Sequence, residues 1–525
     1  MKNIKSTIHT LAALLMAAVA TTACSSDDAT VPVGFTDGNR KVYTMTVEAT
    51  KGGASRDHSR ACPGFSETQP ALYGDAVTRA LSLSDDGKTL YGKWQEGEQV
   101  WVYKKNKWNN WEIIGHLTPT NISADGLRCT LTGSFDALHI DGADGLEAGD
   151  ELKLQLGDDI QPPIVQQDGT LQVISDNYDY NIAMVNIGQV STRTAGDETL
   201  YSVTTTGPAT FEPQLAIVRF NFQDKAGRPI AASHMHPGLL PYDLYITPAS
   251  TSVYVAVNPM NNSNISLRVQ ATVGGESIIS IGDPYLYSRS GVTFEKGKFY
   301  DITVKMNRHV YLNYLESDFT AQDGDVLERA IYDKDYKITI PDGATVTLQD
   351  AKINYENTIT NGTHAGITCA GDATIILDGT SIVRSFGSGY PAIYPGGMGS
   401  TLTINGSGKL RAFGGANATA IGGSSNFSCG NILISGGTVE ATGGTAAPAI
   451  GNYGINKCGT ITIGNTVSRV TATKGSGATN SIGFAGSDFG SCGQVTIGGT
   501  VYWDGSAYQN GGETYLATSP LTYQP

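Results

Sequence analysis

The acidic residues of the C-terminal third are the side chains in this chain best suited to chemistry. Hydrolysis of a glycosidic bond needs two carboxylates that face one cleft. Residues 365–525 contain no histidine, and their acids are few and irregularly placed: Asp372, Asp378, Glu440, Asp488, Asp504 and Glu513. Asp372 and Asp378 fit turn chemistry better than a catalytic pair. We therefore expect no catalytic residues, no cofactor and no enzyme activity.

The histidines and cysteines do not form a metal-binding pattern. His234-Met-His236 precedes a Pro-Gly turn and has no cysteine or acid cluster near it, which favours an ordinary exposed loop over a metal site. None of the seven cysteines forms a CxxC pair. We expect no bound metal.

Three cysteines occupy equivalent places in a repeated segment, each followed by glycine: Cys429, Cys458 and Cys492. If the repeats stack, these residues form a cysteine ladder. Buried free thiols, acting as small apolar side chains, are favoured over a disulfide, because stacked side chains point in parallel. Both readings remain open at this stage.

The N-terminus has the pattern of an export signal. Lys2 and Lys5 precede an apolar run, residues 11–20, that is too short to span a bilayer. The sequence then reaches Ala23 and Cys24, which resembles a lipobox, where a peptidase cuts before a cysteine that carries diacylglycerol. Residues 1–23 are therefore predicted to be a lipoprotein signal peptide, with Cys24 lipidated. An ordinary signal peptide with an incidental cysteine is the alternative.

The segment after Cys24 is polar and contains glycine and proline, which predicts a tether over residues 24–40. Its start, Ser-Ser-Asp-Asp, resembles the acidic tag that directs lipoproteins of Bacteroidetes-type bacteria to the outer face of the outer membrane. It is otherwise only the solvated beginning of the tether. We expect a surface-exposed protein held to the cell outer membrane by its lipid.

Composition indicates an all-β protein. The 525 residues include 64 glycines, and short alternating segments predominate over amphipathic helical patterns. The net charge of −14 disfavours a nucleic-acid partner, because phosphate binding needs clustered Lys and Arg.

Residues 41–306 consist of short alternating segments separated by turns, such as residues 41–48, 99–103 and 215–222. Alternation places one set of side chains inward and the other outward, as in the strands of a sandwich. The length suits two sandwiches, over residues 41–175 and 176–306. Residues 307–334 are expected to be a linker.

Several of these segments resemble fimbrillin-like lipoproteins of Bacteroidetes. The matching stretches are residues 78–80, 94–103, 211–222, 253–259 and 294–306. The resemblance implies two transthyretin-like β-sandwiches. It also implies a pilus subunit that matures when an arginine-specific protease cuts at a position matched by Arg79-Ala80.

In that family, removal of the strand before the cut opens a groove, which a strand from a neighbouring subunit fills. Other fimbrial subunits are then the expected partners. Alternatively, Arg79 is a plain loop residue and the protein stays monomeric. Arg60-Ala61 offers a second cut site.

Residues 335–525 contain a repeat whose units begin with Ala-Ile or a close variant, 27 to 32 residues apart. Each unit holds two or three short β segments joined by glycines and no helical stretch, which predicts one coil of a parallel, right-handed β-helix. Isoleucines at fixed positions would fill its lumen. The repeat resembles bacterial β-helix domains of the carbohydrate-binding type.

Aromatic residues follow the Ala-Ile positions: Tyr394, Phe427, Tyr453 and Phe484. Sugar rings stack on aromatic planes, so these four are predicted glycan contacts, with host or dietary glycans as ligands. The alternative is that they fold back over the coil edges.

Two hypotheses for function follow. In the first, the protein is a fimbrial tip or accessory adhesin, whose sandwiches anchor or assemble while the β-helix binds a glycan. In the second, it is a glycan-capture lipoprotein that does not polymerise. A polysaccharide lyase or hydrolase is the least favoured class.

Overall fold

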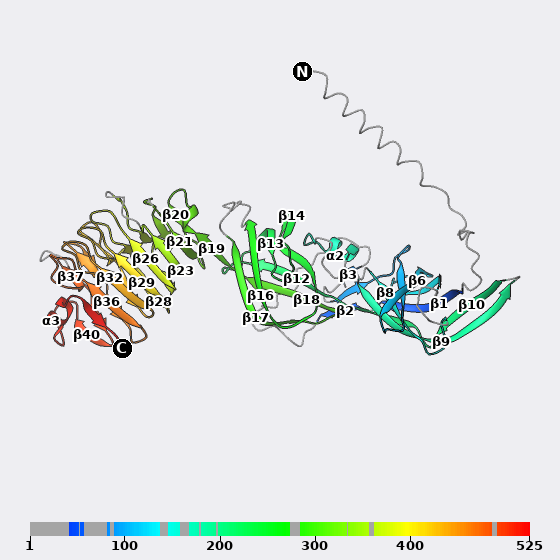
Figure 1. Ribbon diagram of the computed structural model, residues 1–525. Helices are drawn as coiled ribbons and strands as arrows, with labels where there is room; N and C mark the ends of the chain where they lie inside the picture. The colour runs from blue at the N-terminus through cyan, green and yellow to red at the C-terminus, as the bar shows by residue number, and fades with distance from the viewer. Residues whose placement is uncertain are drawn as a thin grey trace, which may run out of the picture.

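The computed structural model describes residues 41–51, 53–56, 81–83, 89–136, 145–157, 167–177, 180–195, 198–272, 284–332, 334–355, 362–485 and 491–525. These residues form three β-rich bodies in a row, with a C-terminal solenoid at the end opposite the first body (Figure 1). The predicted all-β class is confirmed, and the parallel pairings of the C-terminal region are those of a β-helix.

The first body is an eight-stranded sheet whose pairings return to their starting point. β1 pairs with β7 on one side and with β10 and β11 on the other. The alternation seen in the sequence points Tyr43, Met45 and Val47 of β1 into the core. The strands are β1 (Val42–Lys51), β5 (Val100–Lys105), β6 (Trp111–Thr120), β7 (Arg128–Asp136), β8 (Glu151–Leu156), β9 (Asn181–Ala195), β10 (Glu198–Thr205) and β11 (Ala209–Pro213).

The second body has two sheets that enclose a core of large apolar side chains, among them Phe220, Phe222 and Phe294. One sheet contains β15 (Ser252–Val257), β12 (Ala216–Gln223), β18 (Lys298–Lys305), β2 (Gly53–Arg56), β4 (Thr89–Gly92) and β3 (Leu81–Leu83). The other begins with β13 (Ala231–His236), β14 (Leu244–Ser250), β16 (Met260–Thr272) and β17 (Tyr285–Phe294). Helix α2 (Leu171–Asn177) packs its Ile174 against Leu215 and Phe299.

The chain therefore divides between these bodies differently from the predicted ranges. β2, β3 and β4 lie within residues 41–175 but extend the sheet of the second body. β9–β11 lie beyond residue 175 but belong to the first body, so the change of sheet falls between Pro213 and Ala216. Pairing across the sheets decides this, and strand alternation alone does not specify which sheet a strand joins.

The range expected to be a linker is the first coil of the solenoid. It contains β19 (Asn307–Tyr311), the 3₁₀ turn η2 (Leu312–Tyr314), β20 (Phe319–Thr320) and β21 (Val326–Ala330). β19 pairs antiparallel with β17 of the second body and parallel with β21 of the solenoid. One sheet thus runs without a break from the second body into the solenoid.

Each full coil of the solenoid places one short strand on one side and one or two strands on the other. The first side contains β20, β22 (Ile338–Ile340), β24 (Ile367–Cys369), β27 (Ile393–Tyr394), β30 (Ile421–Gly422), β33 (Ile450–Tyr453) and β37 (Ile482–Ala485). The second contains β21, β23 (Ala344–Ile353), β25 (Ala373–Asp378), β26 (Thr380–Arg384), β28 (Thr401–Gly406), β29 (Lys409–Phe413), β31 (Asn431–Ile434), β32 (Thr438–Thr442), β35 (Ile461–Ile463), β36 (Arg469–Thr473) and β39 (Val495–Ile497). A two-stranded ladder of β34 (Lys457–Cys458) and β38 (Ser491–Cys492) adds to the later coils.

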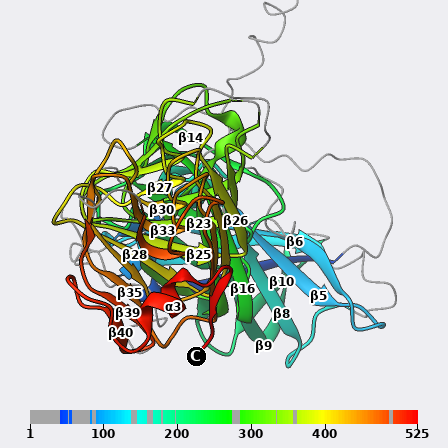
Figure 2. The same ribbon diagram turned by 90° about the vertical axis from the view of Figure 1, so that its left-hand side faces the viewer.

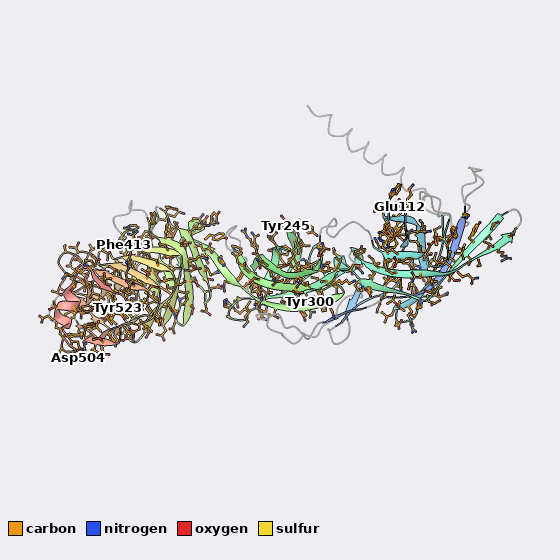
Figure 3. The ribbon with its side chains drawn as sticks, turned by 60° about the horizontal axis from the view of Figure 1, so that its bottom comes forward. Glu112, Tyr245, Tyr300, Phe413, Asp504 and Tyr523 are labelled. Carbon is orange, nitrogen blue, oxygen red and sulfur yellow. The ribbon has the colours of Figure 1, made fainter. Side chains whose placement is uncertain are left out.

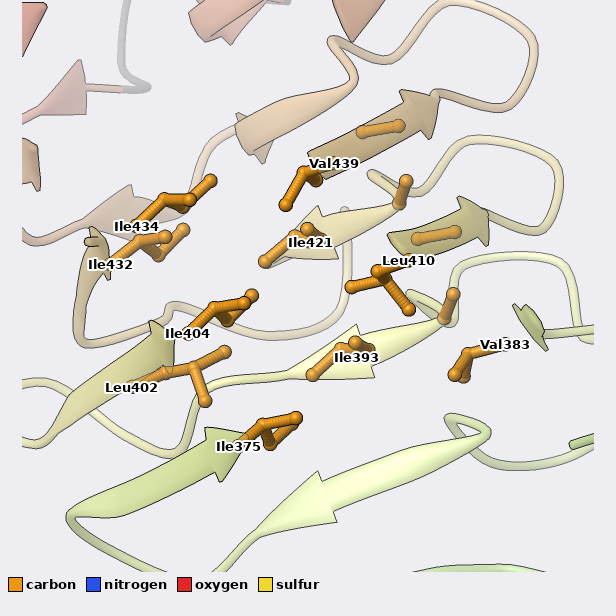
Figure 4. Close-up of a cluster of buried hydrophobic side chains, with 14 of the residues drawn as sticks. Ile375, Val383, Ile393, Leu402, Ile404, Leu410, Ile421, Ile432, Ile434 and Val439 are labelled. Carbon is orange, nitrogen blue, oxygen red and sulfur yellow. The ribbon is translucent and has the colours of Figure 1, made fainter. Parts of the chain in front are cut away.

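Isoleucines at the repeated positions stack along the lumen, as predicted. Ile393, Ile421 and Ile450 are register partners on successive coils, and each is fully buried. Figure 4 shows Ile393 and Ile421 facing residues such as Leu402 and Ile432 from the opposite side. Full burial of each such side chain stabilises the fold by about 1.5–3 kcal/mol.

The last residues of the chain close the end of the solenoid. β40 (Thr500–Trp503) and β41 (Leu521–Tyr523) pair antiparallel with β39 and β36, and α3 (Gly512–Ala517) lies across the terminal coil (Figure 2). Leu516 of α3 and Leu521 join the solenoid core. This cap covers strand edges that would otherwise pair with another chain.

Candidate binding surfaces of the solenoid

Two of the predicted glycan contacts, Tyr394 and Phe427, lie together. The ring centroid of Phe427 is 5.8 Å from that of Tyr394 and 5.6 Å from that of Tyr390. The Tyr394 hydroxyl donates to the backbone oxygen of Ser428 at 3.0 Å, which fixes its ring. Phe427 is 38% exposed, so the aromatic cluster of Tyr390, Tyr394 and Phe427 presents an apolar face to solvent.

The other two predicted contacts do not join this cluster. Phe484 packs against the solenoid core and against Trp503 of the cap, at a centroid distance of 6.2 Å. Tyr453 is partly buried and pairs in register with Ala485. Each aromatic side chain sits at a different offset from its Ala-Ile, and the position of Tyr394 on β27 is Gly422 on the next coil. The four residues therefore do not form one continuous row.

A group of cations on the opposite side of the solenoid is not evident in the linear sequence. Glu440 on β32 accepts three ion pairs, from Lys409 Nζ at 2.7 Å, Arg469 Nη2 at 3.3 Å and Arg411 Nε at 3.5 Å. The register explains the grouping, because Arg411 pairs with Glu440 on the next strand, and Arg469 pairs with Thr438 beside it. We call Arg384, Lys409, Arg411 and Arg469 the basic strip.

Arg384 is the member of the basic strip whose positive charge is least neutralised by acids of the described structure. Its guanidinium carbon lies 4.2 Å from the ring centroid of Phe413, a residue labelled in Figure 3. Its Nε is buried and has no hydrogen-bond partner within the described structure. Burial, and then the positive charge of Arg411, lower the pKa of Arg384 from its usual value.

A cleft of about 700 Å³ adjoins the basic strip at its N-terminal end. Its lining is Asn313, Arg329, Ala330, Tyr332, Asp350, Lys352, Thr380 and Ile382. Thr380 and Ile382 are the register partners of Lys409 and Arg411, so the cleft and the basic strip are continuous. Arg329 lies over the Tyr311 ring at 3.9 Å and Lys352 over the Tyr355 ring at 4.7 Å.

Aspartates at the corners of the coils accept backbone amides from the next coil. Asp342 Oδ1 accepts the Asp372 amide at 2.7 Å, and Asp372 Oδ1 accepts the Thr401 amide at 2.8 Å, one coil further on. Asp350 Oδ1 accepts the Thr380 amide at 2.7 Å in the same way. These residues tie each coil to the next at its corner.

His234 and His236 both contact one carboxylate. His234 Nε2 lies 3.0 Å from Asp243 Oδ2, and His236 Nδ1 lies 2.6 Å from Asp243 Oδ1. Among the residues that the structure describes, no group of three metal-ligating side chains is placed to hold an ion.

The three repeated cysteines lie on successive coils. Cys429 Sγ is 3.0 Å from Cys458 Sγ, and Cys458 is the register partner of Cys492. All three are buried free thiols. Burial raises the pKa of Cys492 to about 12, while the Cys429 hydrogen bond and then burial raise the pKa of Cys458.

The predicted lipidation site Cys24 and the predicted cleavage site Arg79-Ala80 lie outside the described residues. Within the part of the chain that is described, no helix is long and apolar enough to span a membrane.

Comparison with known proteins gives a partial likeness. No protein-family model matches the chain, and no curated protein matches it. Three solved structures resemble it: candidate cell adhesion proteins from Bacteroides fragilis, Bacteroides eggerthii and Bacteroides ovatus, with 11%, 11% and 9% sequence identity. The alignments cover 51% of this chain and 93%, 86% and 95% of those chains, with TM-scores of 0.23, 0.23 and 0.24. At such scores the likeness carries no argument about the role of this chain.

Proposed function

We propose that this protein is a lipid-anchored adhesin of the bacterial cell surface whose solenoid binds glycan. The observation that carries the proposal is the unbroken sheet through β17, β19 and β21. This sheet joins the solenoid directly to the second body, so paired strands, and not an unpaired linker, connect the two. Because Cys24 precedes the first body in the sequence, the first and second bodies lie between the proposed anchor and the solenoid along the chain. The solenoid stands at the end of the row opposite the first body (Figure 1).

The aromatic cluster supplies the contact surface in this proposal. Pyranose rings present an apolar face that stacks on aromatic planes, so a sugar can pack over the exposed face of Phe427 beside Tyr394. The acids described on the coils serve as corner ties or ion-pair partners, which supports binding rather than cleavage.

A glycan array with the full chain tests this function. We expect saturable binding that Phe427→Ala weakens about tenfold, since one aromatic contact is lost. Tyr245→Ala is the matched control, because Tyr245 is an aromatic residue that is 64% exposed on the second body. Absence of binding to every neutral, acidic and mucin-type glycan by the folded chain would refute glycan adhesion.

One observation favours a second role, as a subunit that assembles by strand exchange. β1 pairs with β7 on one side and with β10 and β11 on the other, and β2 pairs with β18. Both β1 and β2 precede Arg79 in the sequence. A cut behind Arg79 would release both strands and leave partners in each body without a strand. In the absence of such a cut, the protein would act as a monomeric glycan-capture lipoprotein.

Limited digestion with an arginine-specific protease separates these two roles. Assembly predicts one cut after Arg79, release of the N-terminal fragment and growth of oligomers in size-exclusion chromatography. Arg79→Ala should block both steps and Arg60→Ala neither. A cut chain that keeps its N-terminal fragment and stays monomeric supports the capture role.

A further inference from the structure

We propose that the basic strip and the adjoining cleft bind an acidic polysaccharide, whose carboxylate or sulfate groups lie along the strip. The inference takes its ligand class from the proposed glycan-binding function but uses a different face from the aromatic cluster. It specifies that the ligand is negatively charged and assigns it a second binding site.

The charge balance of this surface is opposite to that of the whole chain. The cleft and strip contain six cations, Arg329, Lys352, Arg384, Lys409, Arg411 and Arg469, against the two acids Asp350 and Glu440. Asp378, at the neighbouring corner, is hydrogen-bonded to Gln349 at 3.0 Å. A surface with net positive charge on a chain with a net charge of −14 attracts anions locally.

The parallel register spaces these cations regularly. Lys352 pairs with Ile382, which pairs with Arg411, so Lys352 and Arg411 lie two strands apart on one column. Strands are about 4.8 Å apart, which puts their Cα atoms roughly 10 Å from each other. Arg469 lies two strands beyond Lys409 on the adjacent column. An extended chain with repeated anionic groups can follow these columns along the solenoid.

Arg384 provides an unsatisfied donor at this surface. Its Nε is buried and has no hydrogen-bond partner among the described residues, and its guanidinium carbon lies 4.2 Å from the ring centroid of Phe413. A buried donor that lacks a partner costs free energy, which a bound carboxylate or sulfate oxygen would recover. The neighbouring Arg411 raises the positive potential at the same point.

The cleft adds groups that suit a sugar ring. Tyr332 is 49% exposed, and its ring centroid lies 6.3 Å from that of Tyr355 in an edge-to-face arrangement. The ammonium group of Lys352 lies over the Tyr355 ring. Aromatic faces next to Arg329 and Lys352 fit a pyranose that carries an acidic substituent. Asp350 at the edge of this cleft accepts the Thr380 amide at 2.7 Å through Oδ1.

Isothermal titration of the full chain with polygalacturonate, heparin and dextran tests the inference. We expect both polyanions to bind, with affinity that falls as salt rises, and dextran not to bind at this site. Polygalacturonate carries carboxylates alone and heparin carries both sulfates and carboxylates, so binding of heparin alone would show that sulfate is required. Arg384→Gln should weaken the binding of polyanions about tenfold, whereas Lys457→Gln, which removes a charge from the ladder on another side of the coil, should leave it unchanged.

The Glu440→Gln variant tests for a gain of affinity, which a misfolded chain would not show. Removal of the one carboxylate that neutralises Lys409, Arg411 and Arg469 should tighten polyanion binding about threefold or more. Weaker or unchanged binding by a folded Glu440→Gln chain would overturn the inference. Equal affinity for duplex DNA and for the acidic glycans would overturn the glycan assignment.

The two glycan proposals fail separately. If polyanions do not bind but neutral glycans still bind and are lost in Phe427→Ala, the proposed function stands and this inference is wrong. If polyanions bind and Phe427→Ala changes nothing, the basic strip is the binding site and the aromatic cluster is not.

Discussion

Arg308 and Asp325 form a buried bidentate ion pair where the second body meets the solenoid. Arg308 Nε donates to Asp325 Oδ1 at 2.9 Å and Nη2 to Oδ2 at 2.5 Å, with side-chain exposures of 7% and 2%. Arg308 belongs to β19, and Asp325 precedes β21 and also accepts the Gln322 amide at 2.7 Å. The pair therefore fixes the first coil of the solenoid to the strand that enters it.

Asp325→Asn should destabilise this junction by about 3–5 kcal/mol, because it removes the carboxylate that neutralises the buried guanidinium of Arg308. Calorimetry of the full chain should show the solenoid transition at a lower temperature. Glu212→Gln removes the exposed pair with Lys296, whose atoms are 3.4 Å apart, and should cost at most about 1 kcal/mol. Equal effects of the two substitutions would contradict a structural role for the buried pair.

The repeat could be predicted from the sequence because the residues that recur once per coil are those that fill the lumen. Ile393, Ile421 and Ile450 each follow an alanine, and they are register partners in the structure. The first coil lacks this signature, and residues 307–334 resemble a linker. Val310, Leu312 and Leu327 nevertheless complete the same core.

The candidate binding surfaces are harder to predict from the sequence. Lys409, Glu440 and Arg469 lie about one coil apart in the sequence, but only the pairing of β29, β32 and β36 shows that their side chains meet on one face. Conversely, Tyr394 and Phe484 both follow an isoleucine of the repeat, yet Phe484 pairs with Asn452 and packs against Trp503 of the cap. Register, which the loop lengths between strands determine, decides both cases.

Gly451→Ala should destabilise the solenoid by more than about 2 kcal/mol. Gly451 has φ +128°, and a Cβ there would lie 1.8 Å from the backbone oxygen of Gly483 on the next coil. Gly397→Ala is the matched control, because nothing lies within 4 Å of the added methyl group. Chemical unfolding followed by circular dichroism measures both; a Gly451→Ala chain as stable as the control would contradict the close stacking of these coils.

The Asp504 turn should make stability depend on pH in the acid range. Asp504 Oδ1 accepts the amides of Ala507 and Ser506 and the Ser506 hydroxyl, each at 2.8 Å, and these bonds lower the pKa of Asp504 from 3.8 to about 2. A depressed folded-state pKa contributes stability that is fully present above the unfolded value and lost as pH falls through the folded one.

The difference in melting temperature between the wild-type chain and Asp504→Asn should thus be constant above about pH 5 and shrink towards pH 2. Ser506→Ala removes the hydroxyl donor, so the folded-state pKa of Asp504 should rise, and the acid-induced loss of stability should be smaller and complete at a higher pH. A difference that does not change between pH 5 and pH 2 would show that the turn does not hold the carboxylate.

The solenoid cysteines should react slowly with thiol reagents in the folded protein. Burial raises the pKa of Cys369 and of Cys492 to about 12, so little thiolate forms at neutral pH, and solvent does not reach the sulfur atoms. In denaturant, mass spectrometry after alkylation should find Cys429, Cys458 and Cys492 all labelled. A pair that labels only after reduction would show that Cys429 and Cys458, whose sulfur atoms lie 3.0 Å apart, oxidise to a disulfide, and the ladder of free thiols would be wrong.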